Sequence, residues 1–334
     1  MNSKLYKAVF LLIGIATLGY MIHVIGYDVI WHNILKTGWW FIPITGIWLI
    51  VYIFNALAFR IIIHEPGLKE SNIPFLTVLR ITISGYAINY ITPFVALGGE
   101  PYRIMELKKF VGTNKATSSV LLYGLMHMFS HLIFWLLSII LIIFIVPLDN
   151  MLLFGCGIAF LIGILVMLWF LKVYKNGFTI STFRLLQRIP YVRRWAKPFA
   201  EAKAASLAEI DEQIRILYTE RKTAFYNSLI LEILSRIVTC LEIYFAALAI
   251  GLNMSFMDSL IISSASSLFA NLIFFLPMQL GTREGGLVLA LKSMRFPGDS
   301  GIFIGLITRV RELVWIAIGL MLIKTFRRSN PGGE

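Results

Sequence analysis

Long apolar runs, separated by short polar stretches, make up most of the chain. A helix needs roughly 20 such residues to cross about 30 Å of hydrocarbon. We assign as spans residues 5–26, 39–63, 116–146, 151–174, 223–250 and 300–325. None of them shows the strict alternation, over about ten residues, that is typical of a membrane β-strand. The pattern therefore predicts an all-α polytopic membrane protein.

Two further apolar segments, 73–97 and 258–280, are interrupted by Pro and Gly and then run into charged residues. Proline removes a backbone donor and breaks a helix, whereas glycine allows the sharp reversal that follows. We expect the breaks at Asn89, Thr92, Pro93, Gly98 and Gly99 in the first segment and at Pro277, Gly281 and Gly285 in the second. The two segments are either interfacial loops or re-entrant helical hairpins.

Positive charge is concentrated in particular loops. Residues 172–222 hold 11 Lys and Arg against 5 Asp and Glu, whereas 147–150 and 251–258 hold no Lys or Arg. Cytoplasmic loops of membrane proteins carry the excess of Lys and Arg. We therefore expect the N-terminus, residues 172–222 and the C-terminus to be cytoplasmic, with an amphipathic segment at about 175–222.

This orientation requires both interrupted segments to enter and leave the membrane on one side. Residues 73–112 must begin and end at the cytoplasm, and residues 258–296 at the outer surface. The chain, interpreted as one transmembrane domain, then has inverted halves at about 39–146 and 223–325. Each half is built as span, re-entrant hairpin, span, so that about six full spans and two re-entrant segments result. Secondary transporters often have such inverted repeats.

Each interrupted segment places a Glu and an Arg at the start of a returning half-helix. These residues are Glu100 and Arg103 in the first and Arg283 and Glu284 in the second. A half-helix N-terminus favours an anion such as phosphate, and Arg adds a bidentate contact. The Glu side chains could bind an ammonium group or carry a proton. The alternative is that each Glu caps its own half-helix and pairs with the nearby Arg.

Further charges lie deep in the later spans. Glu232 and Arg236 are spaced i,i+4 on one helical face, and Arg309 lies well inside 300–325. Charge at such depth is costly and usually faces a cavity or a partner. These residues either line a polar path or form buried structural ion pairs. His127 and His131 are also spaced i,i+4, but no third zinc ligand accompanies them, so a structural role is favoured and no metal is expected.

Composition narrows the function. Apolar residues make up 58% of the 334 residues and charged ones 14%, with a mean hydropathy of +0.80. Average soluble domains carry about 25% charged residues, so a soluble enzyme and a nucleic-acid binder are excluded. The net charge of +12 is suited to anionic lipid headgroups. No phosphate-binding loop for ATP, hydrolase elbow or dinucleotide fingerprint is present, so no cofactor and no enzymatic activity are expected.

The break sequences resemble those of a known family. Asn89-Tyr90-Ile91-Thr92-Pro93 with Gly99-Glu100-Pro101-Tyr102-Arg103, and Pro277-Met278-Gln279-Leu280-Gly281-Thr282-Arg283-Glu284-Gly285, resemble the two signatures of the lysylphosphatidylglycerol synthetase transmembrane-region family of flippase-like proteins. Met278 and Gln279 replace two Gly of the family pattern. The resemblance covers about 5–325, without the soluble aminoacyltransferase domain of the bifunctional members. It implies lipid translocation and not lipid synthesis.

We therefore expect a lipid translocase of the flippase or scramblase type in a prokaryotic cytoplasmic (inner) membrane. Its partners would be membrane lipids, either an anionic phospholipid or an aminoacylated lipid, and not nucleic acid. Homo-oligomers and a lipid-synthesis partner enzyme are left open. The alternatives are an ion-coupled carrier of a small anionic solute and a non-transporting scaffold of a lipid-synthesis complex.

Overall fold

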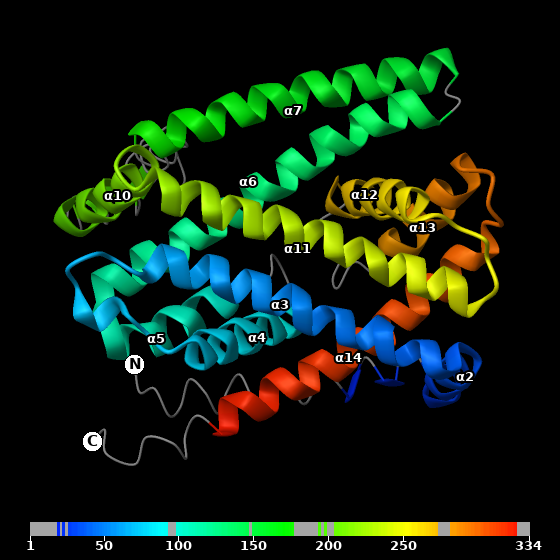
Figure 1. The fold of residues 1–334 in the computed structure, drawn as a ribbon, viewed down its shortest axis with the longest axis horizontal. Coiled ribbons are helices and arrows are strands. Elements are labelled where there is room, and N and C mark those ends of the chain that lie inside the picture. The colour runs from blue at the N-terminus through cyan, green and yellow to red at the C-terminus, as the bar shows by residue number, and fades with distance from the viewer. Residues whose placement is uncertain are drawn as a thin grey trace.

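The protein is all-helical in the residues that the computed structural model describes, which are 19–20, 22–23, 26–92, 98–146, 149–176, 193–194, 197–198, 204–272 and 281–325. The elements are α2 (Tyr27–Thr37), η1 (Gly38–Trp40), α3 (Phe41–Ile63), η2 (Lys69–Ser71), α4 (Phe75–Ile91), α5 (Gly99–Val111), α6 (Thr113–Ile145), α7 (Asn150–Asn176), α10 (Ala204–Thr219), α11 (Lys222–Ala249), α12 (Phe256–Leu272), α13 (Thr282–Ser293) and α14 (Asp299–Thr325) (Figure 1). The expected all-α class is confirmed.

The observed helices cover five of the six expected spans almost end to end. α3, α6, α7, α11 and α14 coincide with the assignments within a few residues. Most of the first span, 5–26, lies outside the described residues. The helix α2, which follows it, was not anticipated from the sequence. Gly38 ends α2 with a positive φ of 57°, a conformation that glycine adopts readily.

Two antiparallel pairs of shorter helices lie between long helices along the chain. α4 and α5 form one hairpin, and α12 and α13 form the other. α4 packs on α14, and α12 packs on α6, while α5 packs on α6 and α13 on α14. Each hairpin therefore contacts the long helix that follows it and the corresponding long helix of the other half. α3 and α11 lie side by side through the middle of the molecule (Figure 1).

The two hairpins start from opposite ends of the molecule. The α4–α5 pair lies toward the end that holds α10, and the α12–α13 pair lies toward the end that holds α2 (Figure 1). Polar contacts between different segments stabilise the end that holds α10. Lys115 Nζ lies 2.5 Å from Glu65 Oε2, and Asn114 donates to Glu209 at 2.6 Å. Arg221 donates to the carbonyl of Ile61 at 3.1 Å. Described residues near 61–65, 114–115 and 209–221, which the charge pattern predicts to be cytoplasmic, thus share one end.

Among the described residues, three helical stretches have the length and apolar composition needed to cross a membrane: Tyr27–Ile63, Thr113–Ile145 and Leu153–Lys172. The last of these, in α7, is almost wholly uncovered by protein, with Phe154 70% exposed. α11 and α14 are as long, with 28 and 27 residues. α11 and α14 are less apolar than the three stretches named above, because they carry Glu232, Arg311 and other charged residues. These charged side chains are buried against the neighbouring helices.

Candidate functional site

The first hairpin is closed by contacts among its own polar residues. The Gly99 N–H donates to Asn89 Oδ1 at 2.6 Å, and Asn89 Nδ2 donates to Glu100 Oε1 at 3.2 Å. A Cβ on Gly99 would lie 2.2 Å from the carbonyl oxygen of Gly85. Glycine is therefore required where α4 and α5 approach most closely. Asn89, and not Glu100, satisfies the free N–H at the start of α5.

Arg103 of this hairpin is buried against aromatic rings. Its guanidinium carbon lies 4.7 Å from the Tyr86 ring centre and 5.3 Å from the Tyr123 ring centre. Its Nη1 donates to Glu100 Oε1 at 3.3 Å. The Arg103 Nε and Nη2 atoms and Glu100 Oε2 are buried without a hydrogen-bond partner in the described part of the chain. This pair thus keeps unused hydrogen-bonding capacity.

The second hairpin binds α14 through two ion pairs. Glu284 accepts from the Gly281 N–H at 2.9 Å and from Arg309 Nε at 3.0 Å. Arg283 pairs with Glu312. Glu284 does cap its own half-helix, as one of the two interpretations predicts. Its cationic partner, however, is Arg309 of α14 and not the adjacent Arg283.

A further ion pair links α14 to α11. Arg311 donates to both carboxylate oxygens of Glu242, at 2.7 and 3.0 Å. The guanidinium carbon of Arg311 lies 3.7 Å from the Trp48 ring centre. Glu312 lies 3.9 Å from Arg311 and 3.7 Å from Arg309. Four Arg and Glu side chains of α11 and α14 therefore share a buried, alternating charge network with the second hairpin.

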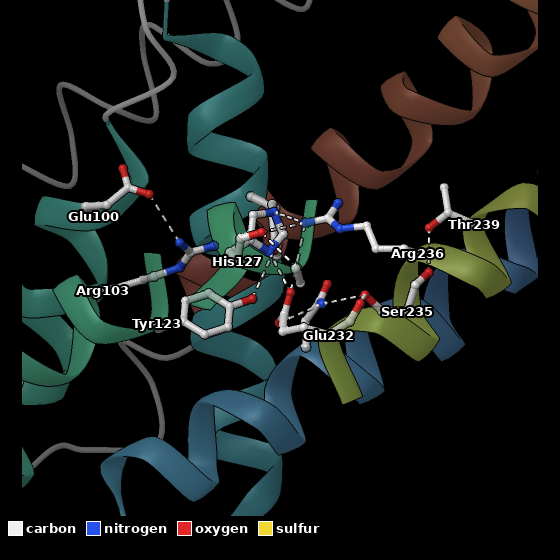
Figure 2. Close-up of polar contacts among 11 residues, drawn as sticks. Glu100, Arg103, Tyr123, His127, Glu232, Ser235, Arg236 and Thr239 are labelled. Atoms are coloured by element: carbon white, nitrogen blue, oxygen red, sulfur yellow. Dashed lines mark hydrogen bonds and ion pairs between the residues drawn. The ribbon is translucent and has the colours of Figure 1, made fainter. Parts of the chain in front are cut away.

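A second network lies where α3, α6 and α11 meet (Figure 2). Glu232 is fully buried, and its Oε1 accepts from Asn55 Nδ2 at 3.0 Å. Glu232 Oε2 lies 2.7 Å from His127 Nδ1. Arg236 Nη2 lies 2.7 Å from His127 Nε2 and 3.9 Å from Glu232 Oε2. The imidazole of His127 thus stands between a carboxylate and a guanidinium. The hydroxyl of Tyr86 completes the group, 3.2 Å from His127 Nδ1.

The hydrogen-bonding capacities of its neighbours assign the tautomer of His127. A guanidinium only donates hydrogen bonds, so His127 Nε2 must be the acceptor from Arg236 and carries no proton. The ring proton is then on Nδ1, which donates to Glu232. His127 is therefore neutral in this arrangement, between an anionic Glu232 and a cationic Arg236.

A cavity of about 220 Å³ opens beside both networks. Its charged lining comes from Arg236 and Glu242 of α11, Arg283 of the second hairpin and Glu312 of α14. The rest of the polar lining comes from Tyr90, His131, Thr239, Ser263, Ser266, Ser267 and Asn271. The Nε of Arg236 is buried without a hydrogen-bond partner among the described residues. The cavity therefore offers hydroxyl groups and charged side chains of both signs.

Among the expected site residues, Arg236 and Arg283 line the cavity. Glu232 does not line it but contacts Arg236. Glu284 and Arg309 also lie outside the lining, and Arg309 links Glu284 to the lining residue Glu312. Glu100 and Arg103 belong to the first hairpin, next to Tyr86 and Tyr123, and do not line the cavity. Of the expected break residues, Asn89, Thr92, Gly98, Gly99, Gly281 and Gly285 lie at or within one turn of the observed helix ends. Pro93 and Pro277 lie outside the described residues.

Several residues of the networks were not singled out from the sequence. Asn55, Tyr86 and Tyr123 carry polar groups on otherwise apolar helices, and buried polar groups of this kind usually have partners. His127 was assigned a structural role. The signal that could have drawn attention to it is its position about three turns inside the apolar span 116–146. In the part of the chain that the structure describes, no group of three His, Cys, Asp or Glu side chains is placed to hold a metal ion.

Comparison with models of protein families gives one match, to the transmembrane region of lysylphosphatidylglycerol synthase, over residues 8–319. Comparisons with curated proteins and with solved structures give no match.

Proposed function

Because the chain belongs to the family of the lysylphosphatidylglycerol synthase transmembrane region, we propose that it moves a lipid headgroup between the two leaflets of the membrane. The observation that carries this proposal is the charged cavity of about 220 Å³ among apolar helices. A phospholipid headgroup needs polar partners at a depth where lipid tails offer none. The cavity lining supplies those partners, so we infer translocation.

The residues of the site divide into binding and positioning roles. Arg236 and Arg283, both at the cavity, would contact the lipid phosphate, because guanidinium groups bind phosphate oxygens in bidentate fashion. Glu312 and Glu284 would hold Arg283 and Arg309 in place. Glu100 and Arg103 would fix the first hairpin, and their buried unpartnered atoms leave room for an additional polar contact.

The charge pattern, together with the contacts at the end that holds α10, supports one orientation in the membrane. We infer that the end with Glu65, Lys115 and Arg221 is cytoplasmic, and that both termini lie on that side of a prokaryotic inner membrane. The halves 39–146 and 223–325 would then be inverted repeats, because α4–α14 and α12–α6 are corresponding contacts. Anionic or aminoacylated phospholipids are the proposed ligands.

Leaflet exchange in proteoliposomes tests the proposal. Fluorescent phosphatidylglycerol and its aminoacylated form are reconstituted with the wild type, and the outer-leaflet dye is reduced chemically. Rapid loss of protected dye with the wild type is expected. The double variant Glu100→Gln and Glu284→Gln should abolish it at equal protein levels, whereas the matched exposed pair Glu70→Gln and Glu220→Gln should not.

The result also separates the alternatives. Full exchange by the Glu100→Gln and Glu284→Gln variant would remove the assigned role of these carboxylates. Absence of exchange with uptake of a soluble organic phosphate would favour the small-anion carrier. Absence of both, together with loss of cellular function on deleting residues 175–222, would favour the scaffold.

A further inference from the structure

Arg236 belongs both to the buried network around Glu232 and to the lining of the cavity. Its Nη2 contacts His127 Nε2 at 2.7 Å, and its side chain lines the cavity. The Nε atom is buried without a hydrogen-bond partner in the described residues. An anion in the cavity would therefore compete with His127 and Glu232 for this guanidinium.

Glu232 depends on Arg236 for charge compensation. The carboxylate is fully buried, and Arg236, at 3.9 Å, is the permanent cation within ion-pair distance of it among the described residues. A buried carboxylate without a cation is strongly destabilised. If an anion draws Arg236 toward the cavity, Glu232 keeps only the neutral Asn55 amide and the neutral His127 imidazole.

His127 can restore the charge balance. Departure of Arg236 exposes Nε2, which is then free to accept a proton. The protonated ring would carry a positive charge 2.7 Å from Glu232 Oε2, forming a new ion pair. Conversely, a proton on Nε2 would place an N–H donor against the Arg236 guanidinium, so that the two states exclude each other.

No other group described around His127 can take over from Arg236 as the cation beside Glu232. Glu232 and Arg236 of α11 contact the ring nitrogens of His127 (Figure 2). Tyr86 of α4 and Tyr123 and His131 of α6 lie against its ring. Asn55 of α3 binds Glu232, and Arg103 of α5 lies over the Tyr86 ring. Arg103 is the additional permanent cation in this set. It is bound to Glu100 and lies over the Tyr86 and Tyr123 rings.

We propose that binding of a phosphate-bearing anion to Arg236 is coupled to uptake of a proton by Nε2 of His127, so that the anion and the proton occupy the protein together. The anion is a phospholipid headgroup if the proposed function holds, and this inference rests on that function for the identity of the ligand. The proton comes from the acid form of the buffer in solution, whose bond to hydrogen breaks as the Nε2–H bond forms, and no other bond is made.

Thermodynamic linkage gives the expected size of the effect. When one proton accompanies each anion, affinity changes by up to about tenfold per pH unit, and it strengthens as the pH falls. The relation is reciprocal, because the bound anion must favour the protonated ring by the same factor. A pH gradient across the membrane would then drive accumulation of the anion toward the more alkaline side.

Calorimetric titration of the purified full chain tests the coupling. A short-chain phosphatidylglycerol is titrated into protein in an uncharged detergent, at one neutral pH, in two buffers of different ionisation enthalpy. The difference between the two heats gives the number of protons taken up, for which we expect about one per lipid bound. Glycerol phosphate is titrated in parallel, to distinguish a lipid headgroup from a soluble phosphate.

Two variants separate the coupling from simple structural damage. His127→Gln removes the proton acceptor, and Glu232→Gln removes the carboxylate that requires a cation. Both should bind the lipid with no proton uptake and with an affinity that no longer depends on pH. His32→Gln, at an exposed position on α2, is the matched control and should keep the wild-type proton count.

The outcomes are distinct. Lipid binding by the wild type without proton uptake, or proton uptake retained by His127→Gln, would overturn the coupling and leave the proposed translocation intact. Failure of the wild type to bind either phosphatidylglycerol or glycerol phosphate would contradict both the coupling and the proposed function.

Discussion

Replacing Arg311 with Met should destabilise the protein more than any other single change in its charge network. Arg311 is fully buried, donates to both oxygens of Glu242 at 2.7 and 3.0 Å and lies 3.7 Å from the Trp48 ring centre. Its removal leaves Glu242 buried with no cation at ion-pair distance in the described residues. Breaking such a buried pair costs about 3–5 kcal/mol, or roughly two to four orders of magnitude in the folding equilibrium.

The partner variant should cost less. In Glu242→Gln, Arg311 retains Glu312 at 3.9 Å and the Trp48 ring. Loss of the charged hydrogen bonds alone is worth about 1.5–3 kcal/mol. The double variant Arg311→Met and Glu242→Gln should recover much of the stability, because replacing both partners of a buried pair is often nearly neutral.

Unfolding in mixed detergent micelles measures these differences. Titration with dodecyl sulfate, followed by the fluorescence of the 8 Trp residues, gives the free energy of unfolding of each variant. Arg80→Met, at an exposed position, is the matched control and should change it little. A loss of less than about 1 kcal/mol in Arg311→Met, or a loss equal to that of Glu242→Gln, would refute this reasoning.

Two further substitutions test the packing and the buried hydrogen bonds, and one labelling experiment tests the topology. Gly99→Ala should separate α4 from α5, because its Cβ would meet the Gly85 carbonyl oxygen at 2.2 Å; overpacking of this kind costs about 1–3 kcal/mol, whereas Gly46→Ala, with no heavy atom within 4 Å, should be neutral in the same unfolding titration. Asn55→Leu should cost about 1–3 kcal/mol by leaving Glu232 Oε1 and Ser235 without their amide donor, and an unchanged unfolding curve would contradict the assigned hydrogen bonds. Single cysteines at Leu68 and Asn253, introduced after removing Cys156 and Cys240, should react with an impermeant thiol reagent from opposite sides of the membrane; labelling from one side would exclude the inferred topology.

The sequence is sufficient for the long helices and for the two hairpins. The apolar runs predict α3, α6, α7, α11 and α14, because their length is set by the thickness of the membrane. The hairpins were predicted from the distribution of Lys and Arg and from the Pro and Gly residues. The observed pairs α4–α5 and α12–α13 lie toward opposite ends of the molecule, as that interpretation requires (Figure 1).

The ion-pair partners could not be predicted in the same way. Along one helix, spacing shows which residues share a face, and it correctly places Glu232 near Arg236. Partners on different helices depend on how those helices pack. Arg283 therefore pairs with Glu312, and Glu284 with Arg309, although Arg283 and Glu284 are adjacent in the sequence. The role of His127 depends on three helices and is visible only when they are assembled.

Above all, we propose that a lipid headgroup enters the cavity that α11 and the second hairpin, α12–α13, line together. A phosphatidylglycerol analogue with a photoreactive group on its headgroup tests it in proteoliposomes, with labelled peptides located by mass spectrometry. We expect labels within residues 236–243 and 263–271, at the cavity wall, and less labelling in Arg236→Gln and Arg283→Gln. Labels confined to residues at the helix ends, with none at the cavity wall, would contradict the account.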